Sequence, residues 1–140
     1  MSKNWYSIKA AAEGKSAAEV YIFDYIGYWD ISARNFIDEL KAIDADQIDL
    51  HINSPGGSVF DGVAIQNSIK HHKANVTVYI DGIAGSIASI IALSGDQIYI
   101  AENAYVIPLL QYVQPVVHRE GLKFTPHVAN FILPQLVEQQ

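Results

Sequence analysis

The sequence contains no cysteine, and no stretch of it is apolar for long. The lack of cysteine excludes disulfides, cysteine nucleophiles and thiolate metal sites, and it fits a cytoplasmic location. The most apolar run, SIASIIAL, is far shorter than the roughly 20 residues of a membrane-spanning helix. The first residues also lack the apolar core of a signal peptide. We therefore expect a cytoplasmic protein with no membrane segment.

Basic residues are few as well. The chain has 9 Lys and Arg against 15 Asp and Glu, which gives a net charge of −6. This balance argues against a general role on nucleic acids or membrane surfaces. Hydrophobic residues make up 50% of the 140 residues and charged residues 17%. Such a composition predicts one folded domain with its own hydrophobic core.

What the sequence does contain is an alternation of strand-like and helix-like segments. Runs of β-branched and aromatic residues predict strands at 19–27, 46–53, 75–81 and 97–101. Helical spacing of apolar residues predicts helices at 30–43, 59–72 and 86–94. This order implies right-handed crossovers and a mainly parallel sheet, which is an α/β fold.

The predicted helices carry recognisable signals. In the first, Ser32 is placed to be the N-cap, and Phe36, Leu40 and Ile43 fall on one face. In the second, Phe60, Val63 and Ala64 share a face. The third ends before Gly95, a residue type that favours helix C-termini.

The chain divides into three parts by composition. Residues 1–18 show no clear period and are predicted to form a loose N-terminal arm. Residues 19–107 carry the alternating pattern and are predicted to form the α/β domain. Residues 108–140 keep a high apolar content without a period, and four prolines interrupt any helix there, so we interpret this segment as a divergent or truncated tail.

Two junctions between strands and helices have residues suited to chemistry. They are NSPGGSV at residues 53–59 and GIAGS at residues 82–86. In parallel sheets, binding sites gather where strand ends meet helix starts. Glycines expose backbone N–H groups that can stabilise an oxyanion, and Ser86 offers a hydroxyl for acyl transfer. A serine nucleophile also needs a base and a group that orients the base.

A structural interpretation of the same serines stays open at this point. Ser58 and Ser86 both precede a predicted helix, where serine is a common N-cap. Ser89 falls inside the helix and is expected to be a packed small residue. The glycine pair in SPGGS can also be a plain turn.

Longer stretches of the sequence resemble a known family. INSPGGSVFDGVAI and VTVYIDGIAGSIASIIALSGDQIYIAENAYV are similar to the proteolytic subunit of the Clp protease, a serine peptidase. The similarity is strongest to the branch of that family found in phages and prophages, and it covers residues 19–106. The resemblance implies a crotonase-like fold built from repeated ββα units.

The resemblance also implies roles for individual residues. Ser86 takes the position of the family's nucleophile, and the backbone N–H groups of Gly57 and Ile87 take the positions of its oxyanion donors. Ser89 remains structural, and Asp81 has no role. The family uses no metal or organic cofactor, so we expect none here.

The resemblance ends where the family places its catalytic histidine. That position, counted forward from Asn103, is Leu109. The family's aspartate lies in a region that this chain does not contain. His118 and His127 of the tail are candidates for a replacement base, although their spacing does not require it. A tail read from another frame after about Ile107 is one hypothesis, and divergence is the other.

Three functions are therefore open. The first is serine endopeptidase activity on a peptide or protein substrate, in a homo-oligomeric ring, with an ATPase unfoldase or a phage capsid or scaffold protein as partner. The second is a catalytically deficient family member that assembles or binds. The third keeps the fold but binds an acyl thioester in the crotonase manner, and the hydroxyl of Ser86 argues against it.

Overall fold

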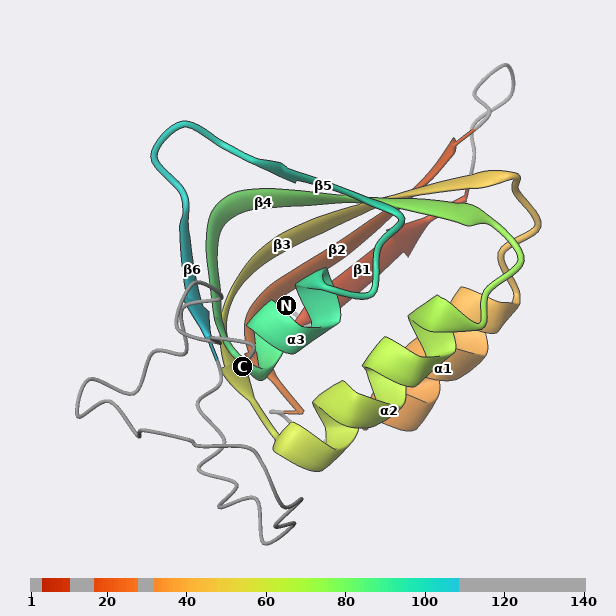
Figure 1. Cartoon of the computed structure of the whole chain (residues 1–140). Coiled ribbons are helices and arrows are strands. Elements are labelled where there is room, and N and C mark those ends of the chain that lie inside the picture. The colour runs from red at the N-terminus through yellow and green to blue at the C-terminus, as the bar shows by residue number, and fades with distance from the viewer. Residues whose placement is uncertain (1–3, 11–16, 28–31, 109–140) are drawn as a thin grey trace, which may run out of the picture. The chain divides into compact units, whose positions relative to one another are not determined.

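The computed structural model describes residues 4–10, 17–27 and 32–108, which form a mainly parallel sheet with helices against one face (Figure 1). The strands are β1 (Tyr6–Lys9), β2 (Ala17–Ile26), β3 (Gln47–Gly57), β4 (Asn75–Ser86), β5 (Gln97–Ile100) and β6 (Tyr105–Pro108). The helices are α1 (Ala33–Lys41), α2 (Val59–Lys70) and α3 (Ile87–Ala92). None of these helices is long and apolar enough to cross a membrane. The predicted α/β class is confirmed.

The sheet follows the order β1-β2-β3-β4-β5, and β6 pairs with the last part of β4. Among the strands that the structure describes, only the pair β1–β2 is antiparallel; the other pairs are parallel. Helices α1 and α2 provide the crossovers that parallel neighbours require. The carboxyl ends of β3 and β4 consequently lie at the same edge of the sheet, where α2 and α3 begin.

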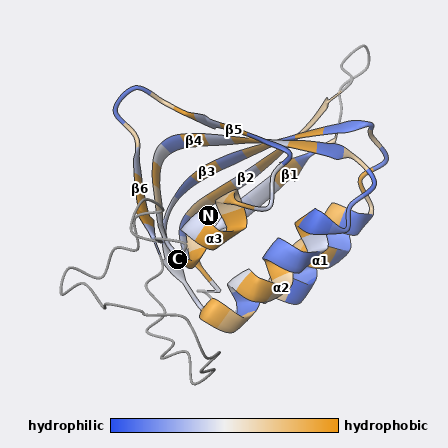
Figure 2. Cartoon of the chain, in the orientation of Figure 1, coloured by the Kyte–Doolittle hydropathy of each residue, from blue (hydrophilic) through white to orange (hydrophobic). Residues whose placement is uncertain are grey.

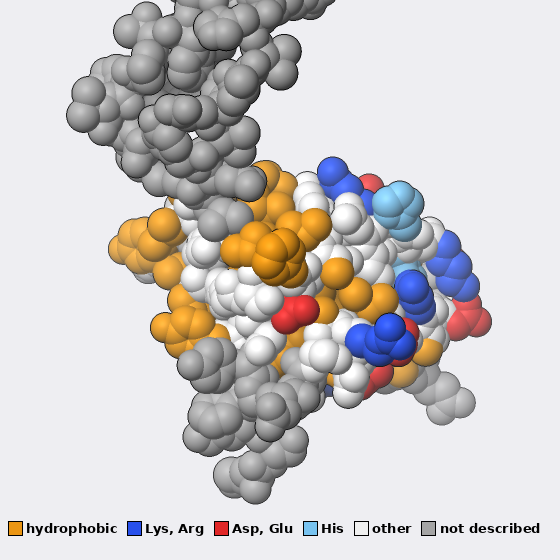
Figure 3. Space-filling view, turned by 90° about the horizontal axis from the view of Figure 1, so that it is seen from below, with side chains coloured by type: hydrophobic (Ala, Val, Ile, Leu, Met, Phe, Trp, Pro, Cys, Tyr) orange, Lys and Arg blue, Asp and Glu red, His pale blue; other side chains and the backbone are white. Residues whose placement is uncertain are grey.

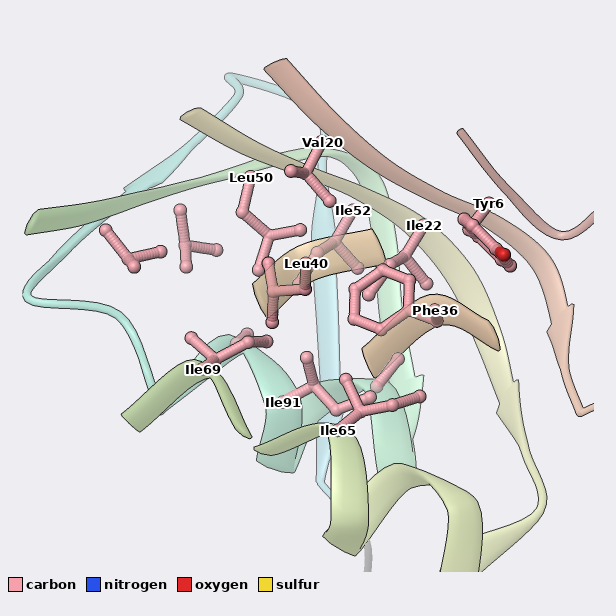
Figure 4. Packing of buried hydrophobic residues seen from close by; sticks show 14 of the residues in the cluster. Tyr6, Val20, Ile22, Phe36, Leu40, Leu50, Ile52, Ile65, Ile69 and Ile91 are labelled. Atoms are coloured by element: carbon pink, nitrogen blue, oxygen red, sulfur yellow. The ribbon is translucent and has the colours of Figure 1, made fainter. Parts of the chain in front are cut away.

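The hydrophobic core lies between the sheet and the helices (Figure 4). Matching residues of β2, β3 and β4 point into it, for example Val20, Leu50 and Val78, which pair in register. From the helices, Phe36 and Leu40 of α1 fill the space below the sheet. This arrangement confirms the predicted apolar face of the first helix. Ser32 occupies its N-cap position with an extended backbone, but its side chain makes no capping hydrogen bond.

The N-terminal residues differ from the predicted loose arm. Tyr6–Lys9 forms β1, and Trp5 is fully buried. The Trp5 ring stacks on Phe36 with centroids 5.6 Å apart, and its carbonyl accepts a hydrogen bond of 2.8 Å from the Phe23 N–H. A four-residue edge strand is too short to show a period in the sequence, which explains why the pattern did not reveal it.

Helix α2 also differs from expectation in the face that it buries. Phe60, Val63 and Ala64 are exposed, and Phe60 is 90% exposed. The buried residues are instead Gly62, Ile65 and Ile69. A Cβ on Gly62 would lie 2.1 Å from Cγ1 of Ile87, so the absence of a side chain lets α2 pack closely on α3. Figure 2 shows the apolar start of α2 at the lower edge of the view.

No helix of the described chain covers the other face of the sheet. A row of stacked rings crosses it instead, and neighbouring members lie 4.9 to 5.4 Å apart between centroids: Tyr21, His51, Tyr79 and Tyr99. These four residues are direct register partners on β2, β3, β4 and β5. Cross-strand aromatic pairs of this kind stabilise a sheet by roughly 0.2–1 kcal/mol each.

Candidate active site

The structure brings the two predicted junctions into contact. Strand β3 continues through Ser54–Gly57, and strand β4 continues to Ser86, with Ser54 paired to Ala84. A Cβ on Gly56 would lie 2.8 Å from the Cβ of Ser86 and 3.3 Å from the backbone N of Ile87. Only a glycine at this position allows the two backbones to approach so closely.

Ser86 has a backbone conformation that is unusual for a residue with a side chain. Its φ is 50° and its ψ is −125°, whereas an N-cap residue ordinarily has an extended backbone. Strained conformations of this kind cost roughly 1–3 kcal/mol and cluster at functional sites. Although Ser86 occupies the N-cap position of α3, its side chain makes no capping hydrogen bond. The capping interpretation of this hydroxyl therefore lacks its defining contact.

The other two serines behave as structural residues. Ser58 is the N-cap of α2, and its hydroxyl oxygen accepts a bond of 3.4 Å from the Asp61 N–H. Ser89 is 3% exposed, and its hydroxyl donates to the Ser86 carbonyl at 2.6 Å. Ser86 thus remains the candidate nucleophile of the three.

The two candidate oxyanion donors belong to different elements. Ile87 is the first residue of α3, and the first N–H groups of a helix have no partner within it. Gly57 is the last residue of β3 and lies against β2, where its register partner is Ile26. The neighbouring Ser58 N–H donates to the Ile26 carbonyl at 2.9 Å, which fixes the path of the chain after Gly57.

No histidine of the described residues reaches the Ser86 hydroxyl. His71 Nδ1 lies 2.7 Å from the Asn67 carbonyl at the far end of α2. His72 is held on both sides, because Nδ1 accepts from the Ala74 N–H at 3.1 Å and Nε2 lies 3.1 Å from the Leu40 carbonyl. Leu109, His118 and His127, the positions that the sequence raised for a base, lie outside the described residues.

The third described histidine makes a contact with a carboxylate that the sequence reasoning missed. His51 Nδ1 lies 2.9 Å from Oδ2 of Asp81, on the face of the sheet opposite the helices. Both residues point outward from neighbouring parallel strands. The alternation of inward and outward residues along the two predicted strands is the signal by which the sequence could have placed them on one face. His51 lies five residues before Gly56 on β3, roughly 16 Å in an extended strand, so this pair is separate from Ser86.

Charged and apolar side chains are segregated on one face of the described residues. Figure 3 shows hydrophobic side chains gathered on one side of the viewed face and Lys, Arg and His side chains on the other. A surface hollow at the far ends of α2 and α3 is lined by 69–75 and 93–96, and none of the predicted site residues line it. Within the described ranges, no group of three or more His, Asp or Glu side chains is placed to hold a metal ion.

Comparison with known proteins places these observations in a family. The family model for Clp protease matches residues 16–114. The ATP-dependent Clp protease proteolytic subunit of Streptococcus mutans is 43% identical over 88 residues, which are 60% of this chain and 43% of that protein. The chain thus spans less than half of the length of this relative.

Solved structures agree with the sequence comparison. A ClpP1 mutant from Listeria monocytogenes is 30% identical, with a TM-score of 0.50, over 65% of this chain and 52% of that chain. An enoyl-CoA hydratase/isomerase family member has a TM-score of 0.52 at 16% identity, over 72% of this chain and 49% of its own. The second likeness concerns the fold alone and confirms the predicted crotonase-like architecture. The family match over most of the described residues shows that this chain belongs to the Clp protease family.

Proposed function

We propose that this chain is a serine peptidase of the Clp proteolytic-subunit type, with Ser86 as its nucleophile. The observation that carries the proposal is the left-handed Ser86, held at the end of β4 against Gly56 with no capping bond to occupy its hydroxyl. In acyl transfer, Oγ of Ser86 would attack the peptide carbonyl carbon, and the carbonyl oxygen would take up negative charge. The Gly57 and Ile87 N–H groups are the proposed donors to that oxygen.

The rate of acyl transfer depends on a base that accepts the proton of the Ser86 hydroxyl. As the Oγ–carbon bond forms, this proton must pass to a base, and in the described part of the chain Ser86 has no side-chain hydrogen-bond partner to take it. A site with oxyanion donors but no base keeps only a small part of the rate of a complete triad. The proposal therefore requires a base from outside the described residues, such as His118 or His127, or from a second subunit.

The proposed substrate is an extended peptide. Such a peptide would add as a strand beside the site, with its main-chain groups hydrogen-bonded to the sheet edge. The name of the Streptococcus relative, ATP-dependent, supports an ATPase as the partner that delivers protein substrates. We further propose a homo-oligomeric ring. Its role in phage protein processing rests on the resemblance of the sequence to the phage branch.

One observation favours a second function. Because the family's histidine position is Leu109 and no described side chain is hydrogen-bonded to the Ser86 hydroxyl, the chain fits a catalytically deficient member that assembles or binds a partner. The two functions predict different reactivity for the same atom, so one measurement separates them.

That measurement is labelling with a fluorophosphonate probe, read by intact mass and peptide mapping. In this reaction the Ser86 Oγ–phosphorus bond forms, the phosphorus–fluorine bond breaks, fluoride leaves and the hydroxyl proton is released. We expect one label per chain, on Ser86, and no label on Ser86→Ala. Ser89→Ala serves as the matched control, since its hydroxyl lies one turn away, and it should still be labelled on Ser86.

Absence of label in the folded, assembled protein would contradict peptidase activity. The assembly or binding role would then be the supported function. Label on several serines at equal rates would likewise contradict an activated Ser86.

A further inference from the structure

Ser54 is a buried polar residue in a row of aliphatic ones. The inward residues of β3 before it are Ile48, Leu50 and Ile52, and Ser54 itself is 0% exposed. A buried hydroxyl is unfavourable unless it is hydrogen-bonded. The Ser54 hydroxyl donates to the Asp24 carbonyl at 2.5 Å and accepts from the Gly56 N–H at 3.1 Å.

These two bonds occur where the sheet loses its regular pairing. Between β2 and β3 the register shifts between Phe23 and Tyr25, where Asp24, with a φ of 64°, stands opposite two residues of β3, Ser54 and Pro55. Between β3 and β4 the register shifts again, from Ile52 to Ser54. Ser54 thus lies at irregularities on both sides, and its hydroxyl satisfies two backbone groups at the interrupted part of the sheet.

One of those groups belongs to the proposed oxyanion segment. Gly56, whose N–H the hydroxyl holds, has a φ of 106°, and it lies so close to the Gly85 carbonyl, the Ser86 Cβ and the Ile87 N that a Cβ on Gly56 would meet all three. Because Gly56 directly precedes Gly57, a hydrogen bond that holds the Gly56 N–H also restrains the backbone that leads into Gly57.

We infer that Ser54 is a positioning residue for the proposed acyl transfer, acting through Gly56 to aim the Gly57 amide at the oxyanion. This inference rests on the proposed function and adds a residue to its machinery. A positioning residue affects the chemical step more than the binding of the reactant, because misplaced donors fail chiefly in the transition state.

The test compares Ser54→Ala with the wild type in fluorophosphonate labelling of Ser86. We expect the maximal labelling rate to fall about 10- to 100-fold, as a displaced donor implies, while the probe concentration for half-maximal rate changes less than about 3-fold. Ser94→Ala is the matched control. Ser94 is also buried, and its hydroxyl donates to the Ile91 carbonyl at 2.5 Å, beyond the far end of α3 from Ser86. Its maximal labelling rate should stay within about 2-fold of the wild type.

A second readout is independent of catalysis. The exchange rate of the Gly56 amide, followed by NMR or by peptide-level mass spectrometry, should rise at least about 10-fold in Ser54→Ala and stay unchanged in Ser94→Ala. If Ser54→Ala does not fold, both the labelling rate and the Gly56 exchange rate are measured on Ser54→Cys. The cysteine side chain has the same shape and is only slightly larger than serine, and its thiol forms only weak hydrogen bonds.

The outcomes separate the two claims. A wild type that is not labelled overturns the proposed function, and faster Gly56 exchange in Ser54→Ala would still support the hydrogen bond that anchors the segment. A Ser54→Ala protein labelled at the wild-type maximal rate overturns the positioning role. So does an unchanged Gly56 exchange rate.

Discussion

At the scale of single residues, the serines of the two similar motifs play different structural roles because their backbone conformations differ. Ser58 and Ser86 both follow a glycine and precede a helix, and the sequence predicts the same capping role for each. Ser58 has an ordinary extended backbone and caps α2, whereas Ser86 is left-handed and caps nothing. The sequence cannot reveal this difference, because the positive φ of Ser86 occurs where the residue packs closely against Gly56, which lies on another strand.

The close approach at Gly56 leads to a prediction. Gly56→Ala would place a Cβ 2.7 Å from the Gly85 carbonyl oxygen, at a φ of 106° that alanine disfavours. We expect a loss of about 2–3 kcal/mol in the free energy of unfolding, measured by urea titration, together with loss of Ser86 labelling. Ala88→Gly, in the buried part of α3, is a control that should lose about 1 kcal/mol or more of stability but keep the label. A Gly56→Ala protein as stable and as reactive as the wild type would contradict the described contact.

At the scale of elements, the sequence predicted the order of strands and helices better than their ends. The predicted strands stop at Asn53 and Asp81, because glycine and proline ordinarily end a strand. In the structure β3 runs to Gly57 and β4 to Ser86, since each has pairing neighbours that extend it across the irregular registers. The motifs thus sufficed to locate the candidate site, but they did not predict that the ends of two strands form it.

Helix α1 and strand β1 are joined by a contact that gives a pH prediction. Tyr6 donates its hydroxyl to Glu39 at 2.8 Å. Burial, and then the hydrogen bond to Glu39 and its negative charge, raise the pKa of Tyr6 to about 12 from the usual 10. The folded state therefore retains the phenol proton over a range in which the unfolded chain releases it. This contribution to stability is complete below pH 10 and is lost as the pH rises through 12.

We expect the free energy of unfolding to fall by up to about 2 kcal/mol between pH 9 and pH 12 because of this one group. In Tyr6→Phe that decline should be smaller by the same amount, while Tyr105→Phe, whose ring is exposed on β6, should follow the wild type. Urea titrations at several pH values measure both. Equal slopes in Tyr6→Phe and wild type would disprove the assignment.

At the scale of the whole molecule, composition and alternation sufficed to predict a mainly parallel α/β fold. They did not predict β1 or the exposed face of α2. The first needed the pairing of Tyr6–Lys9 with β2, and the second needed the contact of Gly62 with Ile87. Both are tertiary effects that residue spacing along the chain does not carry.

The surface of the described residues leads to a prediction about assembly. Large hydrophobic side chains are exposed from the end of α3 through β6, and they are Leu93, Ile98, Tyr99, Ile100, Tyr105, Val106 and Ile107. Exposed apolar surface of this extent is typical of interaction sites. We expect the protein to sediment as a homo-oligomer at micromolar concentration, several times the mass of one chain. A single monomeric species at every concentration tested would contradict the proposed ring.

The continuation of β3 and β4 into the site also has a consequence for heating. Ser86 and Gly57 are the terminal residues of central strands, so we expect the groups proposed to perform the reaction to lose their arrangement together with the pairing of those strands. In many enzymes a loop unfolds locally and activity fades before the fold does. Here the loss of Ser86 reactivity on heating and the unfolding of the sheet should form a single cooperative transition. A core substitution that lowers the melting temperature should therefore lower the temperature of inactivation by the same number of degrees.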